Sequence, residues 1–352
     1  MKFYLNISSS TSKKFMKDIK VGILDQSIVR HGATAREALL ETLETVKLAE
    51  DLGYNRFWVS EHHNSPSIAG SAPEVLMVKL ADETKHIKIG SGGIMLPNHS
   101  AFKMAENFRM LEALFPGRIE MGMGRAPGGD RISAMLLNPS NTFKEEDYLK
   151  QIDHLQHFFR DTAATESGRI YAIPQAESVP AQWILSSSGG SAKIAAEKGL
   201  GLAIAKFING NVPPEIVKIY RDNFQPSESL QEPKVLLSSF VMCGETPQIA
   251  ANMRKYMDYT LVQFEKGNFG KRPPFKEVEQ YEFSAYEQQR LEANSNRIIS
   301  GTQDQVKAEL EELAETYDVD ELVITTMSYD KQLRLKSFQL IAEAMNLQPQ
   351  FA

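Results

Sequence analysis

The sequence contains a single cysteine, Cys243, among its 352 residues. One thiol can form neither an internal disulfide nor a multi-thiolate metal site, which excludes a disulfide-stabilised secreted domain and a cysteine-rich zinc module. This cysteine usage is typical of a reducing compartment, and we therefore expect a cytoplasmic protein.

Positive charge is also scarce. Lysine and arginine total 39 against 45 aspartates and glutamates, which gives a net charge of -6, and the basic residues form no block. Binding to nucleic acid or to an anionic membrane surface would favour such a block, so neither is an expected partner. Long apolar runs are missing as well, and we expect neither a signal peptide nor a membrane-spanning segment.

What the sequence does have is an alternation of short β-branched runs and longer segments with helical periodicity. This alternation is typical of βαβ units and a parallel sheet. Eight units follow one another, which favours a (β/α)8 TIM barrel over a doubly wound sheet, because the latter reverses its strand order and usually has fewer units. The strands are predicted at residues 19–24, 56–60, 87–93, 118–123, 181–186, 200–205, 234–242 and 321–325.

Two of the predicted helices begin with capping signals. Thr34 with Glu37, and Ser71 with Glu74, each match a capping box, in which a hydroxyl and a carboxylate satisfy the first free amides of a helix. These signals predict helix starts at both places.

The barrel is expected to carry insertions after strands 4 and 7. Residues 161–180 form an excursion, and residues 265–300 are rich in charge, proline and aromatic side chains without a clear barrel period. A long segment of the second kind is typical of a lid or of disorder. We expect residues 1–18 to be an N-terminal extension and residues 19–352 to form one barrel domain.

Functional groups of such a barrel lie on the loops after the carboxyl ends of the strands. The first cluster there is Glu61-His62-His63, directly after the second strand. Because side chains alternate along a strand, only one of the two histidines need face the central cleft. The histidines could instead bond to the barrel rim, and a metal site is the less favoured interpretation because adjacent histidines diverge and no further ligands support them.

The second cluster follows the third strand. Gly92 and Gly93 are adjacent, and Met95 and Asn98 come soon after them. Paired glycines allow another group to approach the backbone closely, although on sequence alone a bulge or a tight turn is the favoured interpretation.

The third and fourth clusters both suit a phosphate. Arg125 stands among glycines after the fourth strand, and a guanidinium there fits an anion, or else pairs with a nearby carboxylate. Residues 186–191, Ser-Ser-Ser-Gly-Gly-Ser, lead into a helix, whose N-terminal amides also favour an anion, although one serine could be a simple N-cap. With an apolar wall of Met95, Met123 and Phe207, these clusters are what a mononucleotide would need.

Three segments in this order, residues 58–63 (WVSEHH), 90–97 (GSGGIMLP) and 117–122 (GRIEMG), resemble the luciferase-like flavin monooxygenases. The likeness continues through residues 185–200 and the last strand and helix. The run Leu24-Asp25-Gln26-Ser27 is similar to a branch of single-chain FMN-dependent oxidoreductases.

The resemblance implies FMN as the cofactor, bound in its reduced form. It implies that Arg125, Ser188 and Ser191 hold the phosphate and that His62 is catalytic, beside the reactive edge of the flavin, where it would stabilise a flavin hydroperoxide or move a proton. It also implies a cis peptide bond between Gly92 and Gly93. The full set of predicted cofactor-binding residues is Glu61, Gly92, Gly93, Asn98, Arg125, Ser187, Ser188, Gly189 and Ser191.

The implied activity is a two-component monooxygenase: a separate NAD(P)H:flavin reductase supplies reduced FMN, and molecular oxygen is used to oxygenate a small organic substrate. A homodimer is expected from the resemblance alone. Gly124 stands where luciferase has a reactive-centre cysteine, so light emission is not implied. Three alternatives stay open: hydride transfer with a deazaflavin, a flavin-binding protein without turnover, and a metal-dependent hydrolase.

Overall fold

The computed structural model describes residues 18–140 and 142–349, in which eight parallel strands pair in a ring that closes between the last strand and the first. The predicted (β/α)8 TIM barrel is therefore confirmed. Each predicted strand agrees with the observed one to within two residues at both ends. The strands are β1 (Lys20–Asp25), β2 (Arg56–Val59), β3 (Lys88–Met95), β4 (Ile119–Gly124), β7 (Ala181–Ser186), β8 (Gly201–Ala205), β9 (Val235–Cys243) and β11 (Glu321–Thr325).

A further parallel strand, β10 (Ile298–Gly301), was not predicted. It pairs with β9 from Phe240 to Cys243, whereas β11 pairs with β9 from Leu237 to Phe240, so Phe240 has a partner in both strands. The strand has only four residues and directly follows the short helix η2 (Ser295–Arg297), so no alternation of apolar residues is long enough to reveal it.

Nine helices of the described chain flank the ring. They are α1 (Ala35–Asp51), α2 (Pro73–Asp82), α3 (Ala101–Leu114), α5 (Glu145–Phe159), α6 (Gly190–Glu197), α7 (Glu215–Asn223), α8 (Pro247–Glu265), α11 (Gln303–Thr316) and α12 (Lys331–Ala344). None of the helices described is both long and apolar enough to cross a lipid bilayer.

One of the two predicted capping boxes is present. At α1, the Glu37 amide donates to the Thr34 hydroxyl, and the Thr34 amide donates to the Glu37 carboxylate. The box predicted at Ser71 is wrong, because α2 has Ala72 as its N-cap and no side chain bonds to the free amides there. Proline at the first helical position already has the φ angle of a helix and lacks an amide to satisfy, which moves the start past the serine.

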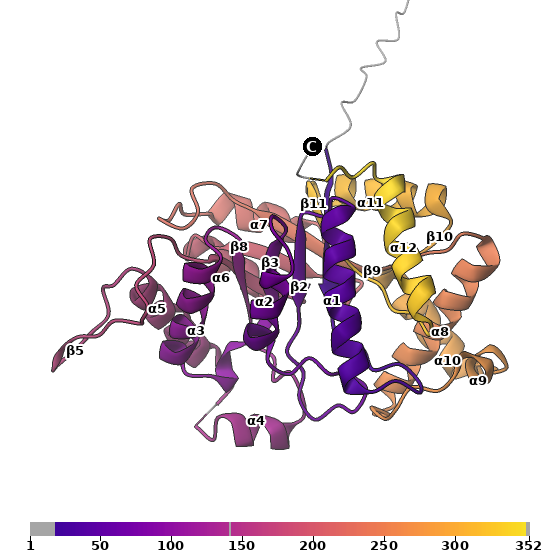
Figure 1. Ribbon diagram of the computed structural model, residues 1–352, viewed down its shortest axis with the longest axis horizontal. Coiled ribbons are helices and arrows are strands. Elements are labelled where there is room, and N and C mark those ends of the chain that lie inside the picture. The colour runs from indigo at the N-terminus through magenta and orange to yellow at the C-terminus, as the bar shows by residue number, and fades with distance from the viewer. Residues whose placement is uncertain (1–17, 141, 350–352) are drawn as a thin grey trace, which may run out of the picture.

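The remaining elements lie in the two long connections. Between β4 and β7 stand α4 (Arg131–Leu137) and a small hairpin of β5 (Ala164–Thr165) and β6 (Gly168–Arg169), and after β9 come α9 (Phe275–Glu279) and α10 (Ala285–Asn294). In Figure 1, α4 lies below the barrel and α9 and α10 lie at its lower right. Most of the predicted extension, residues 1–17, lies outside the described residues.

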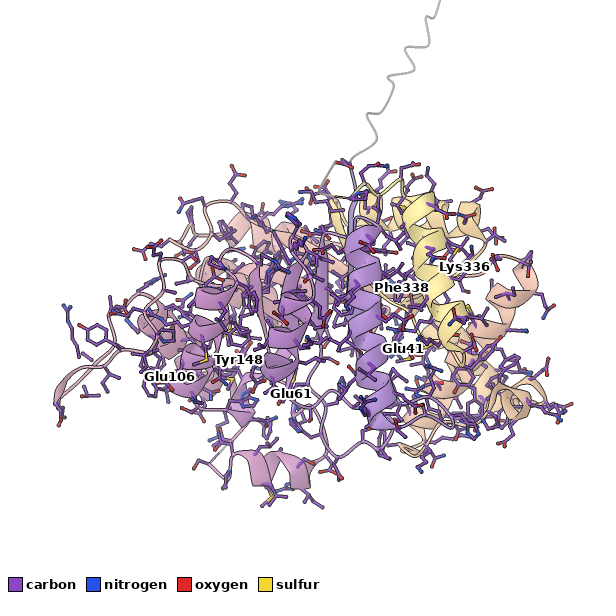
Figure 2. All side chains as sticks on the ribbon, viewed as in Figure 1. Glu41, Glu61, Glu106, Tyr148, Lys336 and Phe338 are labelled. Carbon is purple, nitrogen blue, oxygen red and sulfur yellow. The ribbon has the colours of Figure 1, made fainter. Side chains whose placement is uncertain are left out.

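The carboxyl ends of the strands point towards α4, and Glu61, just after β2, lies low on the barrel in Figure 2. The opposite end of the barrel interior is occupied by Arg56, which is buried and forms ion pairs with Glu120 and Glu321. A buried guanidinium needs such partners because desolvation of an unpaired charge is costly. The amino end of the barrel interior is thus occupied by paired charges, and we expect a ligand site at the carboxyl ends of the strands.

Candidate active site

A cavity of about 370 Å³ opens at the carboxyl ends of the strands, a size that suits a small-molecule ligand. It brings together residues that are up to 299 positions apart in the sequence, from Leu24 to Val323. Seven of the ten predicted site residues line it: Glu61, His62, Gly92, Arg125, Ser187, Ser188 and Ser191. The four clusters proposed from sequence therefore meet at one place; we call this space the first cavity.

At the base of the first cavity, β3 carries two adjacent glycines, of which Gly92 lines the cavity. A Cβ atom on Gly93 would lie 2.1 Å from the side chain of Leu185 and 2.6 Å from the carbonyl oxygen of Gly122. One on Gly92 would lie 2.8 Å from the indole of Trp58, so neither position has room for a side chain. The peptide bond between Gly92 and Gly93 is cis, as predicted.

One side of the cavity is the beginning of α6. Its N-cap is Gly189, with φ +91°, and no side chain caps the helix. The Gly189 amide itself donates to the Ser186 hydroxyl at 3.2 Å, while Ser188 and Ser191 line the cavity. Amides of a first turn that no side chain caps, surrounded by hydroxyls, favour an anionic group at this place.

Arg125 also lines the cavity, and its side chain is 44% exposed. Its Nη1 lies 2.5 Å from a carboxylate oxygen of Glu145, which is itself exposed. Both interpretations drawn from sequence thus apply, since the guanidinium borders the cavity and pairs with a carboxylate. An exposed ion pair contributes little free energy, so Glu145 leaves the guanidinium accessible to an anion.

His62 follows the end of β2 and lines the same cavity as the serines. Its Nδ1 is 3.1 Å from the Ser60 hydroxyl, and its amide donates to the Gly70 carbonyl at 2.9 Å. Burial lowers the pKa of the imidazole, and this effect outweighs the carboxylate of Glu61. The ring is therefore neutral at pH 7. The predicted divergence of the two histidines is observed, because His63 bonds to Glu61 instead of facing the cavity.

Glu61 is fully buried and ties the ends of two strands together. Its carboxylate accepts the Met95 amide at 2.8 Å and lies 2.7 Å from His63 Nε2 and 3.0 Å from His99 Nε2. Burial alone would raise its pKa, but these hydrogen bonds lower it to about 2. The carboxylate is ionised at pH 7 and holds the loop after β3 in place. Among the described residues, no group of three or more histidine, cysteine or acidic side chains is arranged to hold a metal ion.

A second cavity, of about 390 Å³, adjoins the first. The two share four residues: Gln26, His62, Phe207 and Ile208. The outer wall comes from the end of α8 and from residues 268–273, which follow it. The first part of the segment predicted as a lid thus covers a space that meets the first cavity at His62.

The sequence profile that describes the family of luciferase-like monooxygenases matches residues 19–319 of this chain. The chain belongs to this family. Among its curated relatives, the uncharacterized protein YwcH of Bacillus subtilis is 42% identical over 93% of this chain and 99% of its own length. The N-acetyl-S-alkylcysteine monooxygenase of the same organism is 36% identical over 93% of this chain and 98% of its own.

Several solved structures have the same fold as this chain. The structure of apo-MsnO8 superposes with a TM-score of 0.85 at 30% identity, covering 94% of this chain and all of that one. The oxygenating constituent of 3,6-diketocamphane monooxygenase from Pseudomonas putida, solved with FMN, gives a TM-score of 0.69 at 16% identity, over 93% of this chain and 97% of that one. An F420-dependent secondary alcohol dehydrogenase also gives 0.69, at 13% identity, over 93% and 99%. At these two lower identities the likeness shows the fold alone.

Three predicted site residues of this family member do not line the first cavity but shape it. Gly93 and Gly189 provide backbone positions, as described above. Asn98 is buried in the short helix η1 (Leu96–Asn98) and donates to the Pro127 carbonyl at 2.8 Å, which fixes the loop that carries Arg125.

The predicted apolar wall needs one correction. Met95 and Phe207 line the first cavity, but Met123 does not: it is fully buried in the core between strands and helices. Side chains alternate along β4, and Gly122 and Gly124 occupy the inward positions beside Met123. The apolar residues that line the cavity also include Leu24, Trp58 and Leu185.

Sequence reasoning also missed Gln26, which lines both cavities. It directly follows Asp25, the last residue of β1, so the rule that functional groups follow the strand ends would have found it.

Proposed function

We propose that this protein is an FMN-dependent monooxygenase of the two-component kind, which takes reduced FMN from a separate NAD(P)H:flavin reductase and uses oxygen to oxygenate a small organic substrate. One observation carries the proposal. A single cavity has an uncapped helix N-terminus with serines on one side, the paired glycines of β3 at its base, and a half-buried neutral histidine at its border with a second, largely apolar cavity.

The residues present fit FMN. The amides and hydroxyls at Ser187, Ser188 and Ser191, with Arg125, would hold the phosphate, because they combine a helix N-terminus with hydroxyl donors and a cation. Gly92 and Gly93 have no side chains, so an aromatic ring system could approach the backbone of β3 closely. Reduced FMN supplies the electrons for the activation of oxygen.

His62 is the proposed catalytic residue because it borders both cavities. We assign the tautomer in which the Ser60 hydroxyl donates to Nδ1, so that Nε2 carries the proton. A neutral donor at this position can hydrogen-bond to a reacting oxygen atom and later exchange a proton with it. Glu61 is a positioning residue, since its carboxylate is occupied by Met95, His63 and His99.

The second cavity is the proposed substrate site. Its lining includes Phe207, Phe240, Met257 and Phe269. Such side chains bind an apolar molecule and exclude water from the reacting edge. The relative named N-acetyl-S-alkylcysteine monooxygenase supports a small organic molecule as the class of substrate.

We also propose that the protein is a cytoplasmic homodimer and meets the reductase only transiently. Three apolar side chains, Val75 on α2 and Met110 and Leu114 on the adjacent helix α3, are 68%, 56% and 58% exposed, and their burial against a second copy of the chain would stabilise a dimer.

The deciding experiment measures binding of FMN by its visible spectrum and then follows reoxidation of the reduced complex by stopped flow. We expect FMN to bind more tightly than riboflavin, by about tenfold or more, because riboflavin lacks the phosphate and hydrogen bonds to a charged group contribute about 1.5–3 kcal/mol. Ser188→Ala should reduce the difference in affinity between FMN and riboflavin. His62→Ala should change the course of reoxidation, while His154→Ala, an exposed histidine on α5, should not.

Two results would reject the proposal. Reoxidation at the rate of free reduced FMN, unchanged by His62→Ala, would indicate a flavin-binding protein without turnover. Binding of a deazaflavin in preference to FMN would indicate hydride transfer instead of oxygenation.

A further inference from the structure

The second cavity contains a half-buried arginine that has no acidic partner among the described residues. Arg272 lines this cavity, and its Nε atom is buried without a hydrogen-bond partner. Its Nη1 donates to the Thr260 hydroxyl at 3.2 Å. Within residues 18–140 and 142–349, no carboxylate lies at ion-pair distance from this guanidinium, and burial lowers its pKa.

Two arginines that are fully buried do have acidic partners. Arg56 pairs with Glu120 and Glu321, and Arg334 pairs with Asp25 and Glu41. The pairs follow the general rule that a buried charge is compensated by an opposite one. Arg272 departs from the rule at a position that faces an open space.

The charge of the whole lining has the same sign. Lys271, Arg272 and Arg297 contribute cations, and no aspartate or glutamate is among the described residues that line the cavity. Arg297 is already engaged, since its Nε donates to the Phe207 carbonyl at 2.8 Å and its Nη1 to the Asn294 side chain at 2.8 Å. Arg272 therefore has the donors that remain for a ligand.

Arg272 is also held in place by its neighbours. Its carbonyl oxygen lies 3.1 Å from Nδ1 of His31, and the next residue, Pro273, accepts a hydrogen bond from the Tyr256 hydroxyl at 3.2 Å. Phe275 stacks on Tyr329 with ring centroids 4.0 Å apart. These contacts fix the backbone that carries Arg272, so less conformational freedom is lost when its side chain binds an anion.

We infer that Arg272 determines specificity by pairing with a carboxylate of the substrate, and that the substrate is a small organic monoanion with an apolar part. The carboxylate would complete the ion pair that the protein does not supply, and its two oxygens match the planar fork of the guanidinium. The apolar part would lie among Phe207, Phe240 and Met257, next to His62. This inference rests on the proposed function, because the second cavity is the substrate site only if FMN occupies the first.

The experiment uses calorimetric binding to the full-length protein and does not depend on turnover. The probes are ω-phenylalkanoates from phenylacetate to 6-phenylhexanoate, with their methyl esters, which lack the charge, and with sulfonates of matching length. At least one carboxylate should bind with a dissociation constant below about 1 mM and at least about 30-fold more tightly than its ester, since loss of one partner of a buried charge pair has an effect of that size or larger.

Variants identify the cation responsible. Arg272→Gln should remove the preference for acid over ester, and Arg272→Lys should retain part of it. Lys271→Gln is the matched control, because Lys271 lines the same cavity but is exposed, and it should keep the preference. The comparison of acid with ester in the unaltered protein holds even if an arginine variant fails to fold.

Three outcomes would overturn the inference: no carboxylate of the series binds, the esters bind as tightly as the acids, or Arg272→Gln keeps the preference. Tighter binding of a sulfonate than of the matching carboxylate would overturn the assignment of the carboxylate. Failure of the proposed function is recognised separately, because it shows as an unchanged FMN spectrum whether or not the probes bind.

Discussion

Replacement of Glu61 by glutamine should destabilise the fold in a way that depends on pH. The carboxylate accepts hydrogen bonds from the Met95 amide and from two imidazoles while it is fully buried. The lowering of its pKa from 4.5 to about 2 corresponds to about 3 kcal/mol of stability, at 1.36 kcal/mol for each pKa unit. Glutamine cannot carry the charge, so Glu61→Gln should lose a free energy of this order at pH 6.

The dependence on pH follows from the direction of the pKa shift. Because the pKa of Glu61 is lower in the folded state, its stabilising effect is complete above about pH 4.5 and declines as the pH falls towards 2. His99 acts in the other direction: burial alone would lower its pKa, but Glu61 raises it, so this contribution is present below pH 6.5 and is lost as the pH rises through the higher, folded-state pKa. The difference in free energy of unfolding between the unaltered protein and Glu61→Gln should be largest where both contributions are present, between about pH 4.5 and 6.5.

Urea denaturation at a series of pH values from 3 to 9 measures this difference. Glu83→Gln is a suitable control, because hydrogen bonds from Lys47 and Lys79 also lower the pKa of Glu83 to about 2, but on the surface. Its effect should be smaller and should fade at high salt, which screens exposed charges. A difference for Glu61→Gln that stays constant over the whole pH range would refute the reasoning.

Two further substitutions test the packing of the barrel. Gly93→Ala should lower the free energy of unfolding by about 1–3 kcal/mol and weaken FMN binding, because the new Cβ would lie 2.6 Å from the Gly122 carbonyl oxygen. Gly190→Ala is the control for stability, because a Cβ there would have no other atom within 4 Å. Equal melting temperatures of the two variants would contradict this expectation. Glu120→Ala should lower the free energy of unfolding, measured by urea denaturation, by about 3–5 kcal/mol, because it leaves the buried Arg56 with one carboxylate fewer. A loss below about 1 kcal/mol would show that stability does not depend on this ion pair.

Much of the fold could be predicted because each barrel strand is a separate apolar run with its own helix. The segments at residues 181–186 and 321–325 are examples in which the predicted and observed bounds coincide. The prediction failed where local signals compete or are too short. At α2, Pro73 decides the start of the helix in place of Ser71, and β10 has four residues whose pairing with β9 depends on contacts distant in sequence.

The site could be predicted to the extent that it follows strand ends. His62, Arg125 and Ser188 meet in one cavity because parallel strands of a closed barrel bring their carboxyl ends to one rim. The directions of individual side chains were harder to predict, as Met123 shows. The environment of Arg272 could not be predicted at all, since the absence of a carboxylate around a side chain is a property of the folded chain.

The separation of the two cavities has a consequence for how enzymes of this kind diversify. The outer wall of the second cavity lies on residues 268–273, whereas the glycines and serines of the first lie on the barrel itself. Only four residues belong to both, so exchanges in that outer loop can alter which compound is admitted while the redox apparatus is inherited unchanged. Proteins that descend from one ancestral barrel can thereby acquire new small-molecule substrates through changes in a single short loop.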